Sequence, residues 1–113
     1  MVQSQVLDRT FSALSDHTRR DILERLTSGP ASISELADPL HISLPGVMKH
    51  IRVLEGAGLV TTEKKGRVRE CHLAPGDVDD VSVWIDRYRR QWERRFDRLE
   101  AIIQRTQAEE DPP

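Results

Sequence analysis

The sequence of 113 residues has one cysteine, few aromatic residues and no long apolar run. A single cysteine, Cys71, excludes an internal disulfide, and the polar N-terminus shows no signal-peptide core, so a cytoplasmic protein is expected. No stretch approaches the ~18–20 apolar residues of a membrane-spanning helix, so no membrane partner is expected. Because hydrophobic residues are 37% of the chain and aromatic residues only 4%, the core should be small and aliphatic.

The groupings that enzymes and metal sites use are also missing. There is no Gly-rich phosphate loop, no nucleophile beside a His and a carboxylate, and no His-x-x-x-His pair. Zinc usually needs four converging ligands, and the four histidines lie on four different predicted elements. We therefore expect no enzyme, no metal and no cofactor. One metal alternative remains, a subunit-bridging site built from His72 and the acids Asp77, Asp79 and Asp80, although acids there also complement a helix dipole.

Charge is distributed unevenly along a chain whose net charge is −2. Residues 43–73 hold six basic and three acidic side chains, a balance of +3, while residues 1–42 sum to −2 and residues 74–113 to −3. Local field matters more for binding than the global sum does, so this middle segment is the candidate for contact with a polyanion.

Apolar spacing and capping residues predict three short helices in the first part of the chain. The first covers about residues 4–13 and the second about residues 16–27. A capping box from Ser32 to Glu35 opens a third helix, which Pro39 keeps short.

A fourth helix and a hairpin follow. Ser43 caps the helix, and a buried stripe is predicted at Val47, Ile51 and Leu54. Residues 60–64 and 68–73 are rich in Val and Thr and predict a two-stranded hairpin. Its tip lies near Lys65–Arg67, and Cys71 and Leu73 are expected to point inward.

The last helix is predicted from about residue 78 to residue 106, followed by a disordered acidic tail at 107–113. An apolar stripe steps along it by 4, 3, 4, 4, 3 and 4 residues, close to a heptad pattern. So much apolar surface on one helix predicts a homodimer. The expected interface consists of Leu7, Phe11, Val81, Ile85, Tyr88, Trp92, Phe96, Leu99 and Ile103.

Helix, turn, helix and basic hairpin in this order are typical of a winged helix-turn-helix that binds double-stranded DNA. The fold class expected is therefore mainly α with a small β-hairpin, with one domain over residues 1–106 and the long C-terminal helix used for dimerisation. The predicted DNA contacts are Ser43, Leu44, Gly46, Lys49, His50 and Arg52 of the fourth helix, and Lys64, Lys65, Arg67 and Arg69 of the hairpin. For His50, packing against the second helix and metal ligation are the alternatives.

Four segments resemble the ArsR-type winged-helix repressors, over roughly residues 5–75. They are Ala13-Leu-Ser-Asp-His-Thr-Arg-Arg-Asp-Ile-Leu23, Val47-Met-Lys-His-Ile-Arg-Val-Leu54, Gly58-Leu-Val60 and Gly66-Arg67. The resemblance implies a homodimer whose first and last helices pair, and a repressor that leaves its operator when a signal arrives. Metal-sensing members carry a Cys-x-Cys-type motif on the helix equivalent to residues 33–40, which this chain lacks. The pattern from Trp84 to Leu99 is similar to a metal-independent branch of the family.

The function expected is that of a sequence-specific repressor acting as a homodimer on an inverted-repeat operator. A first alternative is a metal- or redox-responsive sensor that uses Cys71. A second is a winged-helix module that binds protein and not DNA. No residue pattern identifies an inducer.

Overall fold

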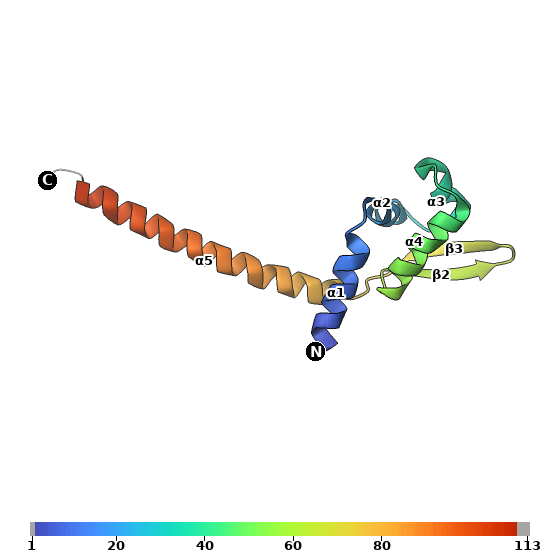
Figure 1. Cartoon of the computed structure of the whole chain (residues 1–113), viewed down its shortest axis with the longest axis horizontal. Helices are drawn as coiled ribbons and strands as arrows, with labels where there is room; N and C mark the ends of the chain where they lie inside the picture. Colours follow the sequence, from blue (N-terminus) through green and yellow to red (C-terminus); the bar gives the residue numbers. More distant parts are fainter. Residues whose placement is uncertain (1, 111–113) are drawn as a thin grey trace. The chain divides into compact units, whose positions relative to one another are not determined.

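The computed structural model describes residues 2–110 and divides the chain into two compact units, one up to Val81 and one from Ser82 onward. The fold is mainly helical with a small antiparallel sheet, as predicted, and it is a winged helix-turn-helix (Figure 1). Its elements are α1 (Val2–Leu14), α2 (His17–Leu26), β1 (Ala31–Ser32), α3 (Ile33–Leu40), α4 (Leu44–Gly56), β2 (Val60–Lys65), β3 (Val68–Leu73) and α5 (Val78–Glu110).

Side-chain caps set where the helices begin, as the sequence predicted. The Ser32 hydroxyl accepts a hydrogen bond from the Glu35 N–H (3.1 Å), and the Glu35 carboxylate accepts one from the Ser32 N–H (3.2 Å). That reciprocal pair holds the pKa of Glu35 below its ordinary value, the backbone N–H of Ser32 being the main cause. Ser43 caps α4 by accepting from the Gly46 N–H (3.2 Å).

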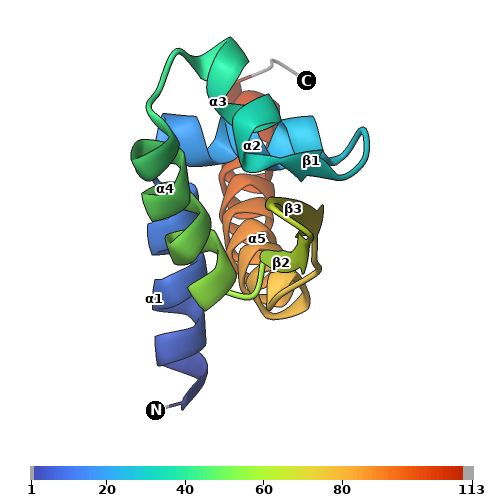
Figure 2. The ribbon, with the colours of Figure 1, turned by 90° about the vertical axis from the view of Figure 1, so that its right-hand side faces the viewer.

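The core of the first unit forms around one side of α4. Val47, Ile51 and Leu54 are all fully buried, which confirms the predicted stripe. They pack in one cluster with Ile22 of α2, Leu36 of α3 and other aliphatic residues. Figure 2 shows α4 running alongside α1 in this unit. Every helix before α5 therefore touches the same core.

The buried side of α1 is not its most apolar side. Thr10 and Ala13 are buried, whereas Leu7 is half-buried and Phe11 is 39% exposed. The Thr10 hydroxyl donates to the Val6 carbonyl (3.1 Å), so its burial leaves no unsatisfied donor. Small residues at 10 and 13 let α1 approach its neighbours closely, and Leu14 packs against the core, whereas Phe11 remains largely exposed.

The sheet has a third strand that the sequence did not reveal. β1 pairs antiparallel with β3, which places Ala31 opposite Cys71, and the strand order is β1-β3-β2. Gly66 supplies the positive φ (66°) that the two-residue loop between β2 and β3 requires. Cys71 is buried as predicted. The expectation for Leu73 is wrong, because this last residue of β3 lies at the end of the sheet and is 47% exposed.

Helix α5 is longer than predicted. It continues to Glu110, because Gln107, Ala108 and the two glutamates that follow are good helix formers, so the first part of the expected tail is helical. Residues 111–113 of that tail lie outside the described residues. No helix within the described range is both long and apolar enough to cross a membrane.

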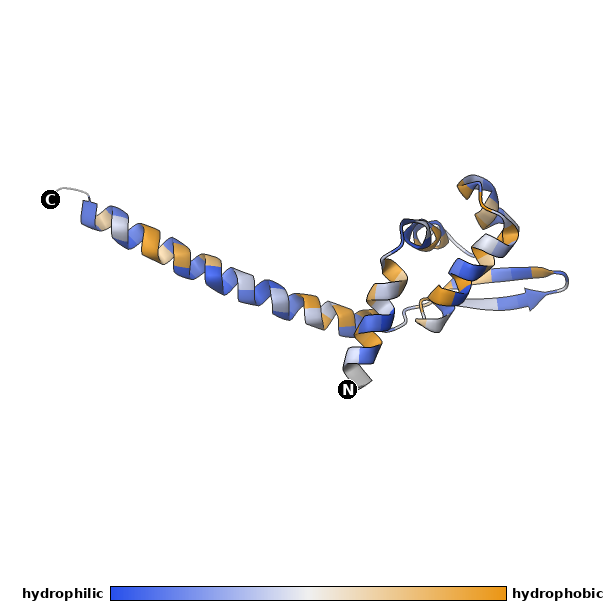
Figure 3. Ribbon diagram, in the orientation of Figure 1, coloured by the Kyte–Doolittle hydropathy of each residue, from blue (hydrophilic) through white to orange (hydrophobic). Residues whose placement is uncertain are grey.

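The stripe along α5 is largely exposed. Val81 is buried within the chain and offers little surface to a partner, but the other predicted interface residues of α5 are 38–61% exposed. Ring contacts connect neighbouring turns, with Trp84 and Tyr88 stacked at 5.6 Å between centroids. Figure 3 shows apolar and polar residues interspersed along the helix, as expected for one with an apolar side.

Candidate nucleic-acid interface

An open groove of about 470 Å³ separates the start of α4 from the tip of the β2–β3 hairpin. Its walls are formed by the N-terminal residues of α3, by Leu44 and Met48 of α4, and by the hairpin segment 67–69. The groove is thus bordered by both α4 and the hairpin, the two segments that the sequence predicted to contact DNA. Met48 was not among the predicted contacts, although its position one turn after Leu44 places both on one side of the helix.

Four of the predicted contact residues carry a positive charge that no internal partner neutralises. Lys49 and Arg52 of α4, Lys64 of β2 and Arg67 of the hairpin tip are exposed, and none forms an ion pair or hydrogen bond within residues 2–110. Such side chains can bind phosphate without first breaking a contact in the protein.

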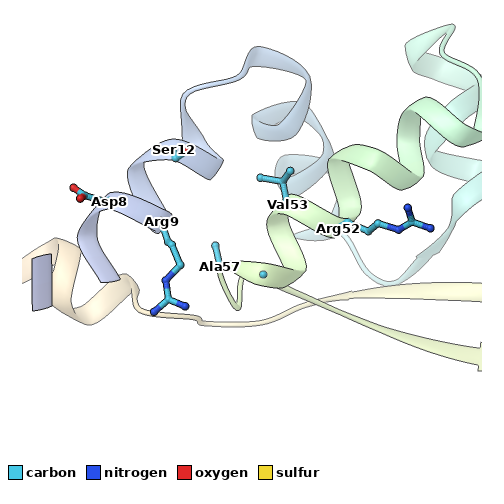
Figure 4. Close-up of a pocket in the computed structure, with 7 residues that line it drawn as sticks. Asp8, Arg9, Ser12, Arg52, Val53 and Ala57 are labelled. Carbon is cyan, nitrogen blue, oxygen red and sulfur yellow. The ribbon is translucent and has the colours of Figure 1, made fainter. Parts of the chain in front are cut away.

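Arg52 also borders a second hollow, between α1 and α4, of about 430 Å³. Its walls are formed by Val53 and Gly56 of α4, by Ala57 directly after that helix, and by Asp8, Arg9 and Ser12 of α1. In Figure 4 the Arg52 side chain extends away from α1, so its guanidinium lies on the outer side of α4 and not in this hollow.

Two other predicted contacts are engaged inside the protein. The Lys65 Nζ lies 3.2 Å from the Glu70 carboxylate across the hairpin. The Arg69 guanidinium donates to the Thr62 hydroxyl (2.9 Å), which donates in turn to the Glu55 carboxylate of α4 (3.0 Å). These bonds stiffen the hairpin and attach it to α4, so binding by Lys65 or Arg69 must compete with them.

The first residues of α4 are held for reasons internal to the fold. Ser43 is used as the cap, and Leu44 is 50% exposed. A Cβ atom at Gly46 would lie 2.6 Å from the Cγ2 atom of Ile42, so a larger residue here would push against that side chain. Glycine at this position is therefore required by the packing of the turn between α3 and α4, in addition to any close approach by DNA.

His50 lies against α2. Its Nδ1 atom is 3.4 Å from the Arg19 guanidinium and 3.8 Å from the Asp16 carboxylate. The N–H of Arg19 bonds the same carboxylate and is the main reason why the pKa of Asp16 is lowered. This placement agrees with packing against the second helix, one of the alternatives drawn from the sequence, and Arg19 is a residue that sequence reasoning missed.

The surroundings of Cys71 favour the neutral thiol. Burial, followed by the nearby charge of Glu55, raises the pKa of Cys71 to about 11. The neighbouring His72 points to Glu70, with its Nε2 atom 2.9 Å from the carboxylate. Within residues 2–110, no group of three or more His, Cys, Asp and Glu side chains could hold a metal ion.

Comparison with known proteins identifies the family. A helix-turn-helix domain model matches residues 14–63. The crystal structure of the ArsR family transcriptional regulator RHA00566 superimposes with a TM-score of 0.74 at 43% identity, over 80% of this chain and 93% of that one. The chain belongs to the ArsR family of transcriptional regulators.

Other relatives are also named as regulators of transcription. The HTH-type transcriptional regulator Rv2034 of Mycobacterium tuberculosis is 41% identical, over 72% of this chain and 76% of the relative. The transcriptional repressor SdpR of Bacillus subtilis is 33% identical, over 70% and 88%. An ArsR-like regulator from Rhodococcus sp. RHA1 superimposes with a TM-score of 0.75 at 31% identity, over 88% and 92%. The Rhodococcus structure therefore shares the fold of this chain.

Replacing Arg67 with Ala is expected to weaken binding to any DNA duplex, because its free guanidinium at the hairpin tip would neutralise one phosphate. The slope of log K against log salt should fall in magnitude by about 0.9, the contribution of one released counterion. Fluorescence anisotropy over a salt series measures both quantities. Arg105→Ala is the matched control, since it removes the same charge from α5 and should leave the slope unchanged. Equal slopes in Arg67→Ala and wild-type protein would remove Arg67 from the interface.

The thiol of Cys71 should be unreactive in the folded protein at pH 8, because a pKa of about 11 leaves almost no thiolate and burial blocks access. Iodoacetamide followed by mass spectrometry should show labelling only after unfolding in guanidinium. Rapid labelling of the native protein would instead support the redox-sensor alternative.

Proposed function

We propose that this ArsR-family chain is a transcriptional repressor that binds double-stranded DNA as a homodimer on an inverted-repeat operator. The observation that carries the proposal is the set of four unpaired cations on the exposed side of α4 and on the adjoining hairpin. In a winged helix-turn-helix, the second helix of the motif enters the major groove and the hairpin follows the phosphate backbone. Repression, and not activation, is favoured by the similarity to SdpR, which is named a repressor.

The arrangement of the site supports different roles for the predicted contacts. Ser43, Leu44 and Gly46 at the start of α4 would lie closest to base edges, and Met48 would add an apolar contact beside Leu44. Lys49, Arg52, Lys64 and Arg67 would neutralise phosphates, with Arg52 also long enough to reach guanine. Lys65 and Arg69 would support the shape of the hairpin and contact DNA only secondarily.

The exposed stripe of α5 supports the proposal that the chain dimerises through this helix. The side chains Ile85, Tyr88, Trp92, Phe96, Leu99 and Ile103 are each at least 38% exposed, a continuous apolar surface that water disfavours. Leu7 and Phe11 on the outer side of α1 are the other predicted interface residues, and their position on that side agrees with this role. A two-fold related pair of α4 helices would then require an operator with inverted symmetry.

The spacing of the stripe is compatible with antiparallel pairing of the two α5 helices, which is the polarity that we propose. Its steps of 4, 3, 4, 4, 3 and 4 residues are the same in both directions from Trp92. In an antiparallel pair with its two-fold axis at Trp92, this symmetry places each apolar residue beside an apolar residue of the partner, for example Ile85 beside Leu99 of the partner subunit. The central Trp92 would face its own copy.

We also infer that DNA binding is independent of metal. The four histidines lie on different elements, at the start of α2, at the end of α3, in α4 and in β3. Among residues 2–110, no group of His, Cys, Asp and Glu side chains is large enough to hold a metal ion. This supports our proposal that the chain belongs to the metal-independent branch that its C-terminal pattern resembles. Since DNA is the proposed partner, the cytoplasm is the expected location.

A gel-shift assay tests the repressor proposal. The probe is a duplex from the region upstream of the protein's own coding sequence, with excess unrelated DNA as competitor. We expect a specific, salt-sensitive complex, an inverted repeat in the footprint, and loss of binding in the Lys49→Ala/Arg52→Ala/Arg67→Ala variant with unchanged circular dichroism. Added zinc, nickel or cobalt should leave the affinity unchanged. A protein with no affinity for any duplex at low salt would instead fit the protein-interaction module.

Cysteine cross-linking tests the dimer and its polarity. In a Cys71→Ala background, Ile85→Cys/Leu99→Cys should form disulfide-linked dimers under oxidation, because an antiparallel pair brings these positions within the ~4.4–6.8 Å between Cα atoms that a disulfide spans. Ile85→Cys alone should not cross-link. Efficient cross-linking of the single variant would indicate parallel helices, and a monomer in sedimentation at micromolar concentration would refute the dimer itself.

A further inference from the structure

The guanidinium of Arg19 contacts two helices other than its own. Its Nε donates to the Ala13 carbonyl (2.7 Å) and its Nη2 to the Ser12 carbonyl (2.9 Å), both in the last turn of α1. Its Nη1 lies 3.4 Å from Nδ1 of His50 in α4. One rigid, planar group therefore connects the end of α1 to the middle of α4.

Arg19 is itself fixed in place by the start of α2. Its N–H donates to the Asp16 carboxylate (3.0 Å), which caps the helix. The same carboxylate oxygen lies 3.8 Å from Nδ1 of His50. Three helices of the first unit thus converge on one small polar cluster, defined by Asp16, Arg19 and His50.

A guanidinium has only donors, so a hydrogen bond from Arg19 to His50 forms in the tautomer whose Nδ1 accepts and whose ring proton is on Nε2. The His50 side chain is about a quarter exposed, and the Nδ1 edge of its ring faces Arg19 and Asp16 inside the protein. This arrangement differs from that of Lys49, the preceding residue, which is exposed and has no partner within the described chain.

Aliphatic packing decides which side of α4 faces the core, because Val47, Ile51 and Leu54 are fully buried there. Apolar contacts are non-directional, so they set the exact rotation of the helix about its axis less sharply than a directional bond does. A hydrogen bond from the side of the helix to a guanidinium that is itself anchored at two carbonyls is directional. Such a contact is able to set which residues α4 presents to the outside.

We propose that Arg19 and His50 are positioning residues for DNA binding, which hold α4 in its binding orientation and connect that orientation to α1. The inference rests on the proposed function, since it assumes that α4 binds DNA and that α1 takes part in the dimer. His50 then contributes to affinity through Arg19 and not by touching DNA. A displacement of the end of α1 would be passed to α4 through this group, in addition to the direct packing of the two helices, which makes the cluster a route by which a change at the dimer interface alters DNA affinity.

A double-mutant cycle tests this inference. The probe is a duplex that the wild-type protein selects from a random-sequence pool, and the variants are His50→Ala, Arg19→Gln and both together. Contacting pairs have non-additive effects, so each single variant should lose about tenfold in affinity and the double variant should lose no more than the worse single one. His50→Gln, whose amide oxygen can still accept from Arg19, should restore most of the affinity.

Matched controls separate positioning from contact and from folding. The fold losses in affinity caused by Lys49→Ala and Arg19→Gln should multiply when the two changes are combined. Lys49→Ala should also reduce the salt slope by about 0.9, whereas His50→Ala should leave that slope unchanged. For each variant, the fraction of protein able to bind DNA is determined by titration at a temperature well below the melting temperature, so that unfolded protein does not lower the measured affinity. Because His50→Ala leaves the bonds of Arg19 to α1 intact, it tests the inference even where Arg19→Gln fails to fold.

Two outcomes would overturn the inference. In the first, the fold losses in affinity caused by His50→Ala and Arg19→Gln multiply in the double variant. In the second, His50→Ala lowers the salt slope. Either result would mean that His50 contacts DNA directly. Failure of the wild-type protein to select any duplex is a different result, which contradicts the proposed function and not the role of the cluster alone.

Discussion

Burial of one side of α4 is the constraint on which the rest of the first unit depends. Three aliphatic side chains of this helix are removed completely from water, at a gain on the order of 1.5–3 kcal/mol each relative to exposure. With that side committed to the core, the opposite side has to face outward, and its polar and basic residues are presented as a set. The hairpin is then attached to the same helix through Thr62 and Glu55, so the two basic elements keep a fixed relation.

The features that the sequence predicted well are those set by residues close together in the chain. The capping box at Ser32 and Glu35, the cap at Ser43 and the glycine of the hairpin turn act over three or four residues, so their patterns are visible in one dimension. The stripe of α4 is visible for the same reason, since its spacing repeats with the helical turn. For the candidate site, these local signals were enough to select the helix and the hairpin.

The features that the sequence did not predict depend on contacts between distant segments. β1 has only two residues, and its pairing with β3 joins positions forty residues apart. The buried side of α1 uses Thr10 and Ala13 because neighbouring helices approach there, which the apolar pattern of α1 alone cannot reveal. The contact of His50 with Arg19 spans 31 positions, and either residue read alone resembles a basic group available to DNA. The fold therefore decides which basic residues have partners inside the protein and which are available to DNA.

The edges of the small sheet affect how the protein associates with itself. An exposed strand edge offers unpaired N–H and C=O groups to any other strand and is a common cause of aggregation. Here one edge is β1, which is too short to template a new strand, and the other is β2, which carries Glu63, Lys64 and Lys65 toward its end. Charged residues on an edge strand oppose the addition of another strand. A basic hairpin that projects from the unit can therefore stay exposed at high protein concentration without drawing molecules together through their sheets.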